Sequence, residues 1–318
     1  MQRRAMLKLA GMSAIATMAA AESAAAIPVL DAHIHLYDPL RPGGVVWPEK
    51  SDTALYRPTL PPRYLEHAAR LGVVGAIAVE CSPLRADNQW LLNLAAGHRE
   101  IVGVIGDLDP CAAEFRGDLD RLHADPLFLG FRYGNLWGRD LAADLEKPGF
   151  LEGLKALAQA GLTFESANPD ARLIAALCRV VEAVPDLRVV VDHLPHAVLP
   201  DGAAALQAWQ ADLQRLAASP HVFVKLSEIP VRSDGKLVTA PGAYKPALDA
   251  LSEIFGEDKL IFGSDWPNSD HVASYAETFA IVSRYMATKP LPVREKFFWR
   301  NSITAYRWRP RKSGQPSL

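Results

Sequence analysis

The feature that most constrains the fold is a regular alternation of short apolar runs with helical segments. Each run is rich in Val, Ile, Leu and Phe, as expected for a strand that is buried on both faces. The runs occupy residues 29–36, 73–80, 101–108, 128–133, 162–166, 187–193, 221–226 and 260–265. Helical patterns follow them at 61–71, 87–95, 118–123, 150–160, 168–184, 203–218, 244–255 and 274–286. The alternation predicts parallel strands joined by crossover helices.

Eight such units close naturally into a (β/α)8 TIM barrel, an α/β fold. An open, doubly wound sheet is the alternative. No Gly-x-Gly-x-x-Gly follows the first run, however, so a dinucleotide site has no support. Because barrels of this length commonly form one unit, residues 27–318 are predicted to be a single TIM-barrel domain.

Composition excludes some classes of partner. The chain has 318 residues, of which 49% are hydrophobic and 22% charged, and its formal net charge is −2. These values are typical of a globular protein with a large core. No basic stretch or charge block indicates binding to nucleic acid. A small-molecule substrate is therefore expected, and nothing in the sequence indicates an oligomeric state.

The N-terminus has the pattern of a cleavable export signal. Arg3, Arg4 and Lys8 precede an alanine-rich apolar run at 9–21, and small residues follow at 24–26. The arginine pair is typical of a twin-arginine signal, with a Sec signal or an amphipathic helix as the alternatives. The run is too short to span a bilayer comfortably. Residues 1–26 are thus predicted to direct the protein to the periplasm and to leave no membrane span after cleavage.

The cysteines do not form a disulfide framework. There are three of them, Cys81, Cys111 and Cys178, and they are widely spaced. Cys178 follows a helical apolar pattern and is expected in the core. Cys81 and Cys111 follow neighbouring predicted strands, so a bridge between them stays open in an oxidising compartment.

A His-x-His pair in the first predicted strand points to a metal or catalytic site. Side chains two apart on a strand share a face, so His33 and His35 would present two imidazoles together. Two adjacent imidazoles form half of a transition-metal site, although paired structural histidines are the alternative. The last predicted strand delivers one carboxylate, Asp265, at its end, and this favours the site.

Polar residues recur where the other predicted strands end. In a barrel the C-terminal ends of the strands build the active site. Burying a charged residue is costly, so a charged residue at the end of an apolar core strand indicates that this end is solvated or reactive. These residues are His33, His35, Glu80, Asp107 or Asp109, Arg132, Glu165, His193, Lys225 and Asp265.

Several of these segments resemble the amidohydrolase superfamily, and more narrowly its amidohydrolase-2 branch, which includes lactonases. The resembling segments are Asp-Ala-His-Ile-His at 31–35, Gly-Phe-Arg at 130–132, Val-Asp-His at 191–193, Val-Lys-Leu-Ser at 224–227 and Gly-Ser-Asp-Trp-Pro at 263–267. The resemblance implies a barrel, hydrolysis of a cyclic ester, and one divalent metal, Zn or Mn, or none.

The resemblance also implies roles for individual residues. His33, His35 and Asp265 match the family's ligand positions, and His193 matches its strand-six histidine. No lysine ends strand four, which argues against a two-metal centre. Strand five ends in Glu165 and a serine instead of histidine, which removes a ligand of decarboxylase-like relatives and shifts the expectation toward a lactonase.

Each role has a chemical reason. Asp265 could activate water as a base or as a metal ligand, and His193 could bond the ester carbonyl. Arg132 and Lys225 could bind a substrate carboxylate, or could form structural salt bridges. Glu80 and Ser82 are further candidate substrate contacts, with Glu80 alternatively a ligand or a partner of one. Candidates for lining the pocket are Trp47, Tyr133, Arg232 and Tyr244.

The predicted function is therefore hydrolysis of a small lactone, either the lactone of a sugar acid or a carboxylated unsaturated lactone. A metal-dependent decarboxylase of an aromatic or unsaturated acid is the enzymatic alternative. An exported binding protein that kept the fold without turnover is the third. Loops at 39–62 and 228–243 would set the substrate.

Overall fold

Eight parallel strands form one sheet whose strand order follows the chain. In the computed structural model, which describes residues 27–197 and 200–318, every pair of neighbouring strands is parallel. The strands are β1 Val29–Ile34, β2 Val73–Val79, β3 Ile101–Asp107, β4 Phe128–Arg132, β5 Thr163–Ser166, β6 Arg188–Val191, β7 Val222–Leu226 and β10 Leu260–Phe262. The predicted export signal at 1–26 lies outside the described residues.

The sheet closes on itself just beyond β10. Ile34 and Trp266 form a parallel bridge. The Asp265 N–H donates to the His33 carbonyl at 2.9 Å, and the His35 N–H donates to the Trp266 carbonyl at 2.8 Å. This closure completes a (β/α)8 barrel and confirms the predicted fold class.

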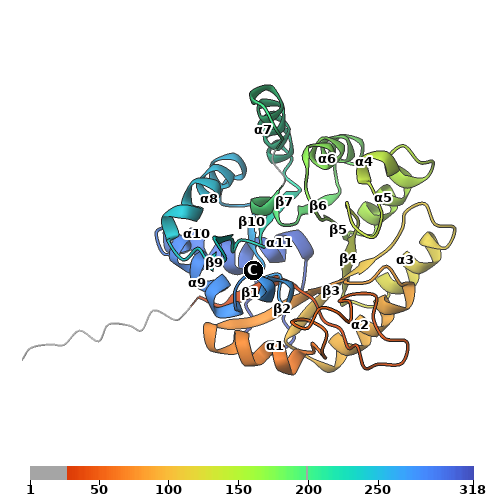
Figure 1. Ribbon diagram of the computed structural model, residues 1–318. Helices are drawn as coiled ribbons and strands as arrows, with labels where there is room; N and C mark the ends of the chain where they lie inside the picture. Colours follow the sequence, from red (N-terminus) through yellow and green to blue (C-terminus); the bar gives the residue numbers. More distant parts are fainter. Residues whose placement is uncertain (1–26, 198–199) are drawn as a thin grey trace, which may run out of the picture.

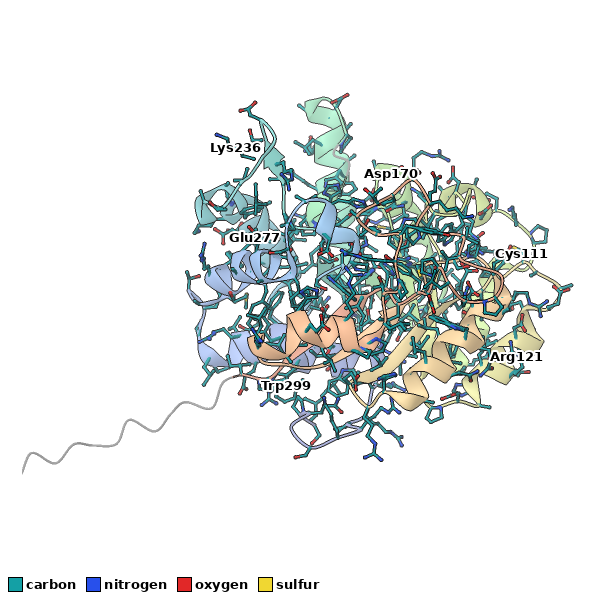
Figure 2. The ribbon with its side chains drawn as sticks, turned by 60° about the horizontal axis from the view of Figure 1, so that its bottom comes forward. Cys111, Arg121, Asp170, Lys236, Glu277 and Trp299 are labelled. Atoms are coloured by element: carbon teal, nitrogen blue, oxygen red, sulfur yellow. The ribbon has the colours of Figure 1, made fainter. Side chains whose placement is uncertain are left out.

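The helices surround the strands in chain order, as Figure 1 shows in a view close to the barrel axis. The main helices are α1 Pro61–Ala68, α2 Arg85–Gly97, α3 Phe115–His123, α5 Phe150–Gln159, α6 Ala171–Ala183, α7 Ala203–Ala218, α8 Pro241–Phe255 and α9 Tyr275–Met286. The short ones are η1 Ala69–Leu71, α4 Leu141–Asp144, η2 Leu194–His196, η3 Asn268–His271, α10 Leu291–Glu295, η4 Lys296–Arg300 and α11 Asn301–Tyr306. A two-stranded hairpin, β8 Arg232–Ser233 and β9 Lys236–Leu237, follows β7, and Figure 2 shows Lys236 on this projecting arm.

Local chemistry explains several helix ends. The Asp170 carboxylate accepts from the Leu173 N–H at 2.8 Å and caps α6. Gly72 follows η1 with φ of 79°, a backbone conformation that glycine adopts without strain. The helix predicted from residue 87 begins two residues earlier, at Arg85. Asp87 lies in its first turn, where its side chain accepts a hydrogen bond from Arg41 instead of capping the helix.

The core has two parts. One lies between the strands and the surrounding helices. The other lies inside the barrel, where side chains from alternate strand positions meet C-terminal aromatic residues, among them Trp299, Tyr306 and Trp308. Because these apolar groups occupy one end of the interior, the polar strand ends remain at the other end, where the site lies.

Two further expectations concern cysteine pairing and membranes. Cys81, Cys111 and Cys178 are all free thiols, so the bridge considered between Cys81 and Cys111 does not form in this structure. Within the described residues, no helix combines the length and apolar character needed to cross a bilayer.

Candidate active site

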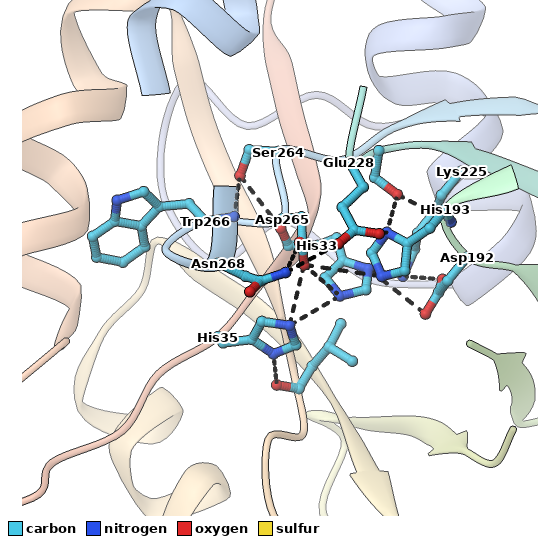
Figure 3. Close-up of polar contacts among 12 residues, drawn as sticks. His33, His35, Asp192, His193, Lys225, Glu228, Ser264, Asp265, Trp266 and Asn268 are labelled. Atoms are coloured by element: carbon cyan, nitrogen blue, oxygen red, sulfur yellow. Dashed lines mark hydrogen bonds and ion pairs between the residues drawn. The ribbon is translucent and has the colours of Figure 1, made fainter. Parts of the chain in front are cut away.

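Four side chains from three places in the chain converge at the C-terminal ends of the strands. His33 and His35 come from the end of β1, His193 follows β6, and Asp265 follows β10. Asp265 Oδ1 lies 3.2 Å from His35 Nε2, 3.4 Å from His33 Nε2 and 3.9 Å from His193 Nε2. Figure 3 shows the three rings around this oxygen. The structure therefore brings together the four residues on which the sequence prediction centred.

Hydrogen bonds outside this group orient its members. His35 Nδ1 lies 3.0 Å from the Val79 carbonyl, so it carries the proton and leaves Nε2 facing Asp265. His193 Nδ1 lies 2.9 Å from the Ser227 hydroxyl. The Asn268 amide donates to Asp265 Oδ2 at 2.7 Å. Each contact holds its residue by one polar atom. The other polar atoms, His35 Nε2, His193 Nε2 and Asp265 Oδ1, face one another.

The donor set fits a divalent transition metal. Asp265 Oδ1 is buried and has no hydrogen-bond partner among the described residues. Ligand atoms of His33, His193 and Asp265 lie within 4.8 Å of one another. Imidazole nitrogens with a carboxylate oxygen suit a metal such as zinc. A buried carboxylate oxygen without a partner is unfavourable, and a metal bound between it and the imidazoles would supply that partner.

Burial and nearby charges set the protonation of the centre. Burial alone would raise the pKa of Asp265, but the neighbouring His193, His35 and His33 outweigh it, and the pKa is lowered. Burial and the Lys225 ammonium hold the pKa of His33 well below its usual value. At neutral pH the centre therefore contains a carboxylate and a neutral imidazole, the forms that bind a metal or accept a proton.

A buried charged layer lies beneath the centre. The Lys225 ammonium is 2.6 Å from Glu165 Oε1, 3.1 Å from Asp192 Oδ1 and 3.4 Å from His33 Nδ1. Tyr306 donates its hydroxyl proton to Glu165 at 2.5 Å. Burial, followed by the charge of Asp192, raises the pKa of Glu165 to about 7. Lys225 is completely buried and lies below the floor of the site rather than at its surface.

Arg132 is also committed to protein partners. Its Nε donates to Glu80 Oε1 at 2.7 Å, and Nη2 donates to the Glu80 carbonyl at 2.8 Å. Nη1 lies 3.4 Å from His33 Nε2 and 3.7 Å from Asp192. Arg132 lines the cavity, yet its planar fork is occupied by Glu80. This arrangement is the salt bridge that the sequence offered as the alternative to carboxylate binding.

Glu80 and Ser82 face a different space. Glu80 Oε2 accepts from the Ser82 N–H at 2.9 Å and from Trp137 Nε1 at 3.1 Å. Both residues line a neighbouring cavity of about 20 Å³, which shares Trp47 and Cys81 with the main one. That volume corresponds to about one water-sized sphere. Substrate contact by these two residues stays a prediction.

The main cavity opens over three of the four converging side chains, His35, His193 and Asp265, and has a volume of about 220 Å³. Trp47 lines it, as the sequence suggested. Its walls also contain polar and aromatic residues that sequence reasoning did not single out: Trp137, Asn168, Glu228 and Asn268. Tyr133 and Tyr244 instead direct their hydroxyls to Asp144 and to the Val238 carbonyl, and Arg232 is exposed.

Backbone strain collects around this cavity. Among the described residues seven non-glycine residues have positive φ, and five of them line it, namely Trp137, Asn168, His193, Glu228 and Asp265. Such conformations cost energy and cluster at functional sites. Asn168 and Glu228 could have been found by extending the strand-end rule by one or two residues, because they follow β5 and β7 closely.

Comparisons with known proteins bear on the family and the fold of this chain. The family model described as Amidohydrolase matches residues 30–308. An L-fucono-1,5-lactonase of Burkholderia ambifaria is 30% identical over 248 residues, or 76% of this chain and 80% of that protein. An L-fucono-1,5-lactonase of Burkholderia multivorans is 30% identical over 291 residues, or 85% and 92% respectively. A crystal structure of a zinc-bound amidohydrolase from Burkholderia multivorans superposes with a TM-score of 0.76 at 24% identity, covering 89% of this chain and all of that one.

Proposed function

Because the chain belongs to the amidohydrolase family, whose model matches residues 30–308, we propose that it opens the ring of a small sugar lactone by attack of water. The observation that carries the proposal is the convergence of His33, His35, His193 and Asp265 on one point of the cavity floor. The relatives named as L-fucono-1,5-lactonases support the ester chemistry.

The chain's own residues account for the proton transfers. Asp265 Oδ1 has no donor among the described residues and faces the cavity, so it can take a proton from water. Asn268 holds Oδ2 in place. His193, oriented by Ser227, can donate from Nε2 to the ester carbonyl, where negative charge develops. The water oxygen bonds to the carbonyl carbon and the ring C–O bond breaks. The ring oxygen takes up the proton that Asp265 removed from water, and a hydroxy acid is released.

His33, His35 and Asp265 would hold a single divalent metal, and a bound Zn²⁺ or Mn²⁺ would polarise the carbonyl and lower the pKa of water. The chain supports this with His35 Nδ1 bonded to a carbonyl, which directs Nε2 to the site. The place below His33, where Glu165 and Asp192 could hold a second cation, is already taken by the Lys225 ammonium. We therefore propose one metal and not two.

The lactone proposal is tested by acid release. Opening of a lactone produces a carboxylic acid, so purified enzyme should acidify a weakly buffered solution of L-fucono-1,5-lactone or of other neutral sugar lactones above the spontaneous rate. Production of carbon dioxide from an aromatic or unsaturated acid, without acidification by any lactone, would favour the decarboxylase instead. Saturable lactone binding without product would favour the binding protein.

The metal proposal has its own test. Treatment with a chelator should abolish activity, Zn²⁺ or Mn²⁺ should restore it, and elemental analysis should find about one metal per chain. Full activity in metal-free protein would contradict the metal-assisted route.

We also propose that the protein acts in the periplasm after removal of residues 1–26. The arginine pair supports a twin-arginine signal, which a receptor reads by side-chain identity and not by charge alone. Replacing Arg3 and Arg4 with lysine should leave precursor in the cytoplasm, as measured by fractionation and immunoblotting. Unchanged export would favour a Sec signal.

A further inference from the structure

One charged side chain of the main cavity has no part in the centre just described. Besides the histidines, the charged groups lining the cavity in the described part of the chain are Arg132, Glu228 and Asp265. Asp265 belongs to the reactive centre, and the Arg132 fork is occupied by Glu80. Glu228 remains, with its side chain 27% exposed.

The position of Glu228 is fixed by its backbone and by one amide. It follows β7 and has φ of 54°, which turns its side chain over the cavity instead of along the strand. The Asn268 amide donates to Glu228 Oε1 at 3.2 Å and to Asp265 Oδ2 at 2.7 Å. Figure 3 shows this amide between the two carboxylates.

The Glu228 carboxylate is not neutralised by a protein cation. Among the described residues no lysine or arginine forms an ion pair with it, and its nearest basic atom is His193 Nδ1, at 4.0 Å from Oε2. His193 Nδ1 is itself bonded to Ser227. Oε2 thus presents acceptor lone pairs to the cavity, which Trp47 and Trp137 also line.

We infer that Glu228 determines specificity by accepting hydrogen bonds from ring hydroxyls of a neutral, polyhydroxylated lactone and by repelling lactones that carry a carboxylate. An ionised carboxylate accepts hydrogen bonds and donates none. Apart from the proposed metal, a substrate carboxylate would meet like charge in Glu228 and no unpaired lysine or arginine among the described lining residues, because Arg132 and Lys225 are paired with Glu80, Glu165 and Asp192. Indole faces bind the C–H surface of a sugar ring without contributing charge. This inference rests on the proposed lactonase function and narrows its substrate class.

The test compares two lactones and two amide variants. Glu228→Gln keeps the size of the side chain and its contact with Asn268, while it removes the charge. Asp234→Asn makes the same change in the exposed turn of the β8–β9 hairpin and is the matched control. The substrates are L-fucono-1,5-lactone, which is neutral, and a muconolactone, which is carboxylated.

For the wild type and for Asp234→Asn, kcat/KM should be higher on the neutral lactone. Glu228→Gln should lose about 10- to 100-fold in kcat/KM on that substrate, mainly through KM, because a hydrogen bond to a charged acceptor becomes a weaker neutral one. On the carboxylated lactone the same variant should gain, because the repulsion is removed. Thermal unfolding establishes that each variant folds.

Equal kcat/KM of Glu228→Gln and the wild type on both lactones would overturn the inference. So would an equal loss on both that appears only in kcat, since this would indicate a general catalytic effect. If the wild type opens neither lactone, the proposed function fails. Calorimetric titration of the unreacted lactones then decides the role of Glu228. We expect Glu228→Gln to bind the neutral lactone about tenfold more weakly than the wild type. Equal binding would contradict the inference.

Discussion

In the proposed mechanism, both routes of water activation depend on Asp265, which would serve as a base alone or as a base that also binds the metal. Asp265→Asn keeps the shape and the Asn268 contact but removes the proton acceptor. We expect kcat to fall by at least about 100-fold, the lower end of what general bases contribute. Steady-state acid release measures this, with Asp270→Asn on the neighbouring η3 turn as the control. Near-normal turnover would contradict both routes.

Lys225 is expected to support the site from below. Lys225→Met would remove the cation that contacts both buried carboxylates, Glu165 and Asp192. Breaking such a buried pair costs roughly 3–5 kcal/mol. We expect a lower urea midpoint together with a lower kcat, because His33 loses its neighbour at Nδ1. The exposed Lys245→Met is the control and should keep the wild-type midpoint. A change in KM alone, at unchanged stability, would instead indicate direct substrate contact.

At this scale the sequence predicted which residues converge but not the partners of the cations. His33, His35, His193 and Asp265 were predictable because strand ends of a barrel share one face. Arg132 and Lys225 also end strands, and a cation at a strand end looks the same whether it faces substrate or a buried carboxylate. Only the three-dimensional contacts with Glu80 and Glu165 distinguish the two.

At the scale of elements, Asp31 ties β1 to the segment after β10. Oδ1 accepts from the backbone N–H groups of Ser264 and His33, and Oδ2 accepts from the hydroxyls of Tyr64 and Tyr275. Asp31→Ala would leave these buried donors unpaired, at about 1–3 kcal/mol for each unsatisfied group. We expect a loss of roughly 3–5 kcal/mol in the free energy of unfolding, measured in urea.

Asp31→Asn provides the comparison, since it keeps the shape and an acceptor for the two backbone groups. We expect it to be intermediate in stability. Equal stability of Asp31→Ala and the wild type would show that the Asp31 hydrogen bonds do not stabilise the contact between β1 and the segment after β10.

The long elements were predictable and the short ones were not. Helices such as α7 and α9 have clear apolar periodicity, and their observed bounds lie within a residue of the expected ones. The hairpin β8–β9 and the turns α4, α10 and α11 are each at most six residues long, too short for a periodic pattern. β10 has three residues, because beyond Phe262 the backbone closes the barrel through single bonds instead of a regular ladder.

At the scale of the whole molecule, the C-terminal segment braces the end of the barrel opposite the site. The Arg311 guanidinium donates to the carbonyls of Ala95, His98 and Ile101, between α2 and β3. Arg311→Ala should lower the free energy of unfolding by about 1.5–3 kcal/mol, as expected for hydrogen bonds from a charged group. Activity at moderate temperature should be unchanged, with the exposed Lys312→Ala as the control. Lost activity at unchanged thermal stability would contradict a role of Arg311 in stability alone.

The closure of the barrel and its chemistry use the same few residues. The backbone of His33, His35 and Asp265 makes the bonds that join the first strand to the last, while their side chains form the candidate site. A ligand held by these side chains would therefore cross-link the first strand to the segment that follows the last strand. Occupancy of the centre and integrity of the whole cylinder are thermodynamically linked: any compound that binds there must raise the melting temperature, whether or not it is turned over.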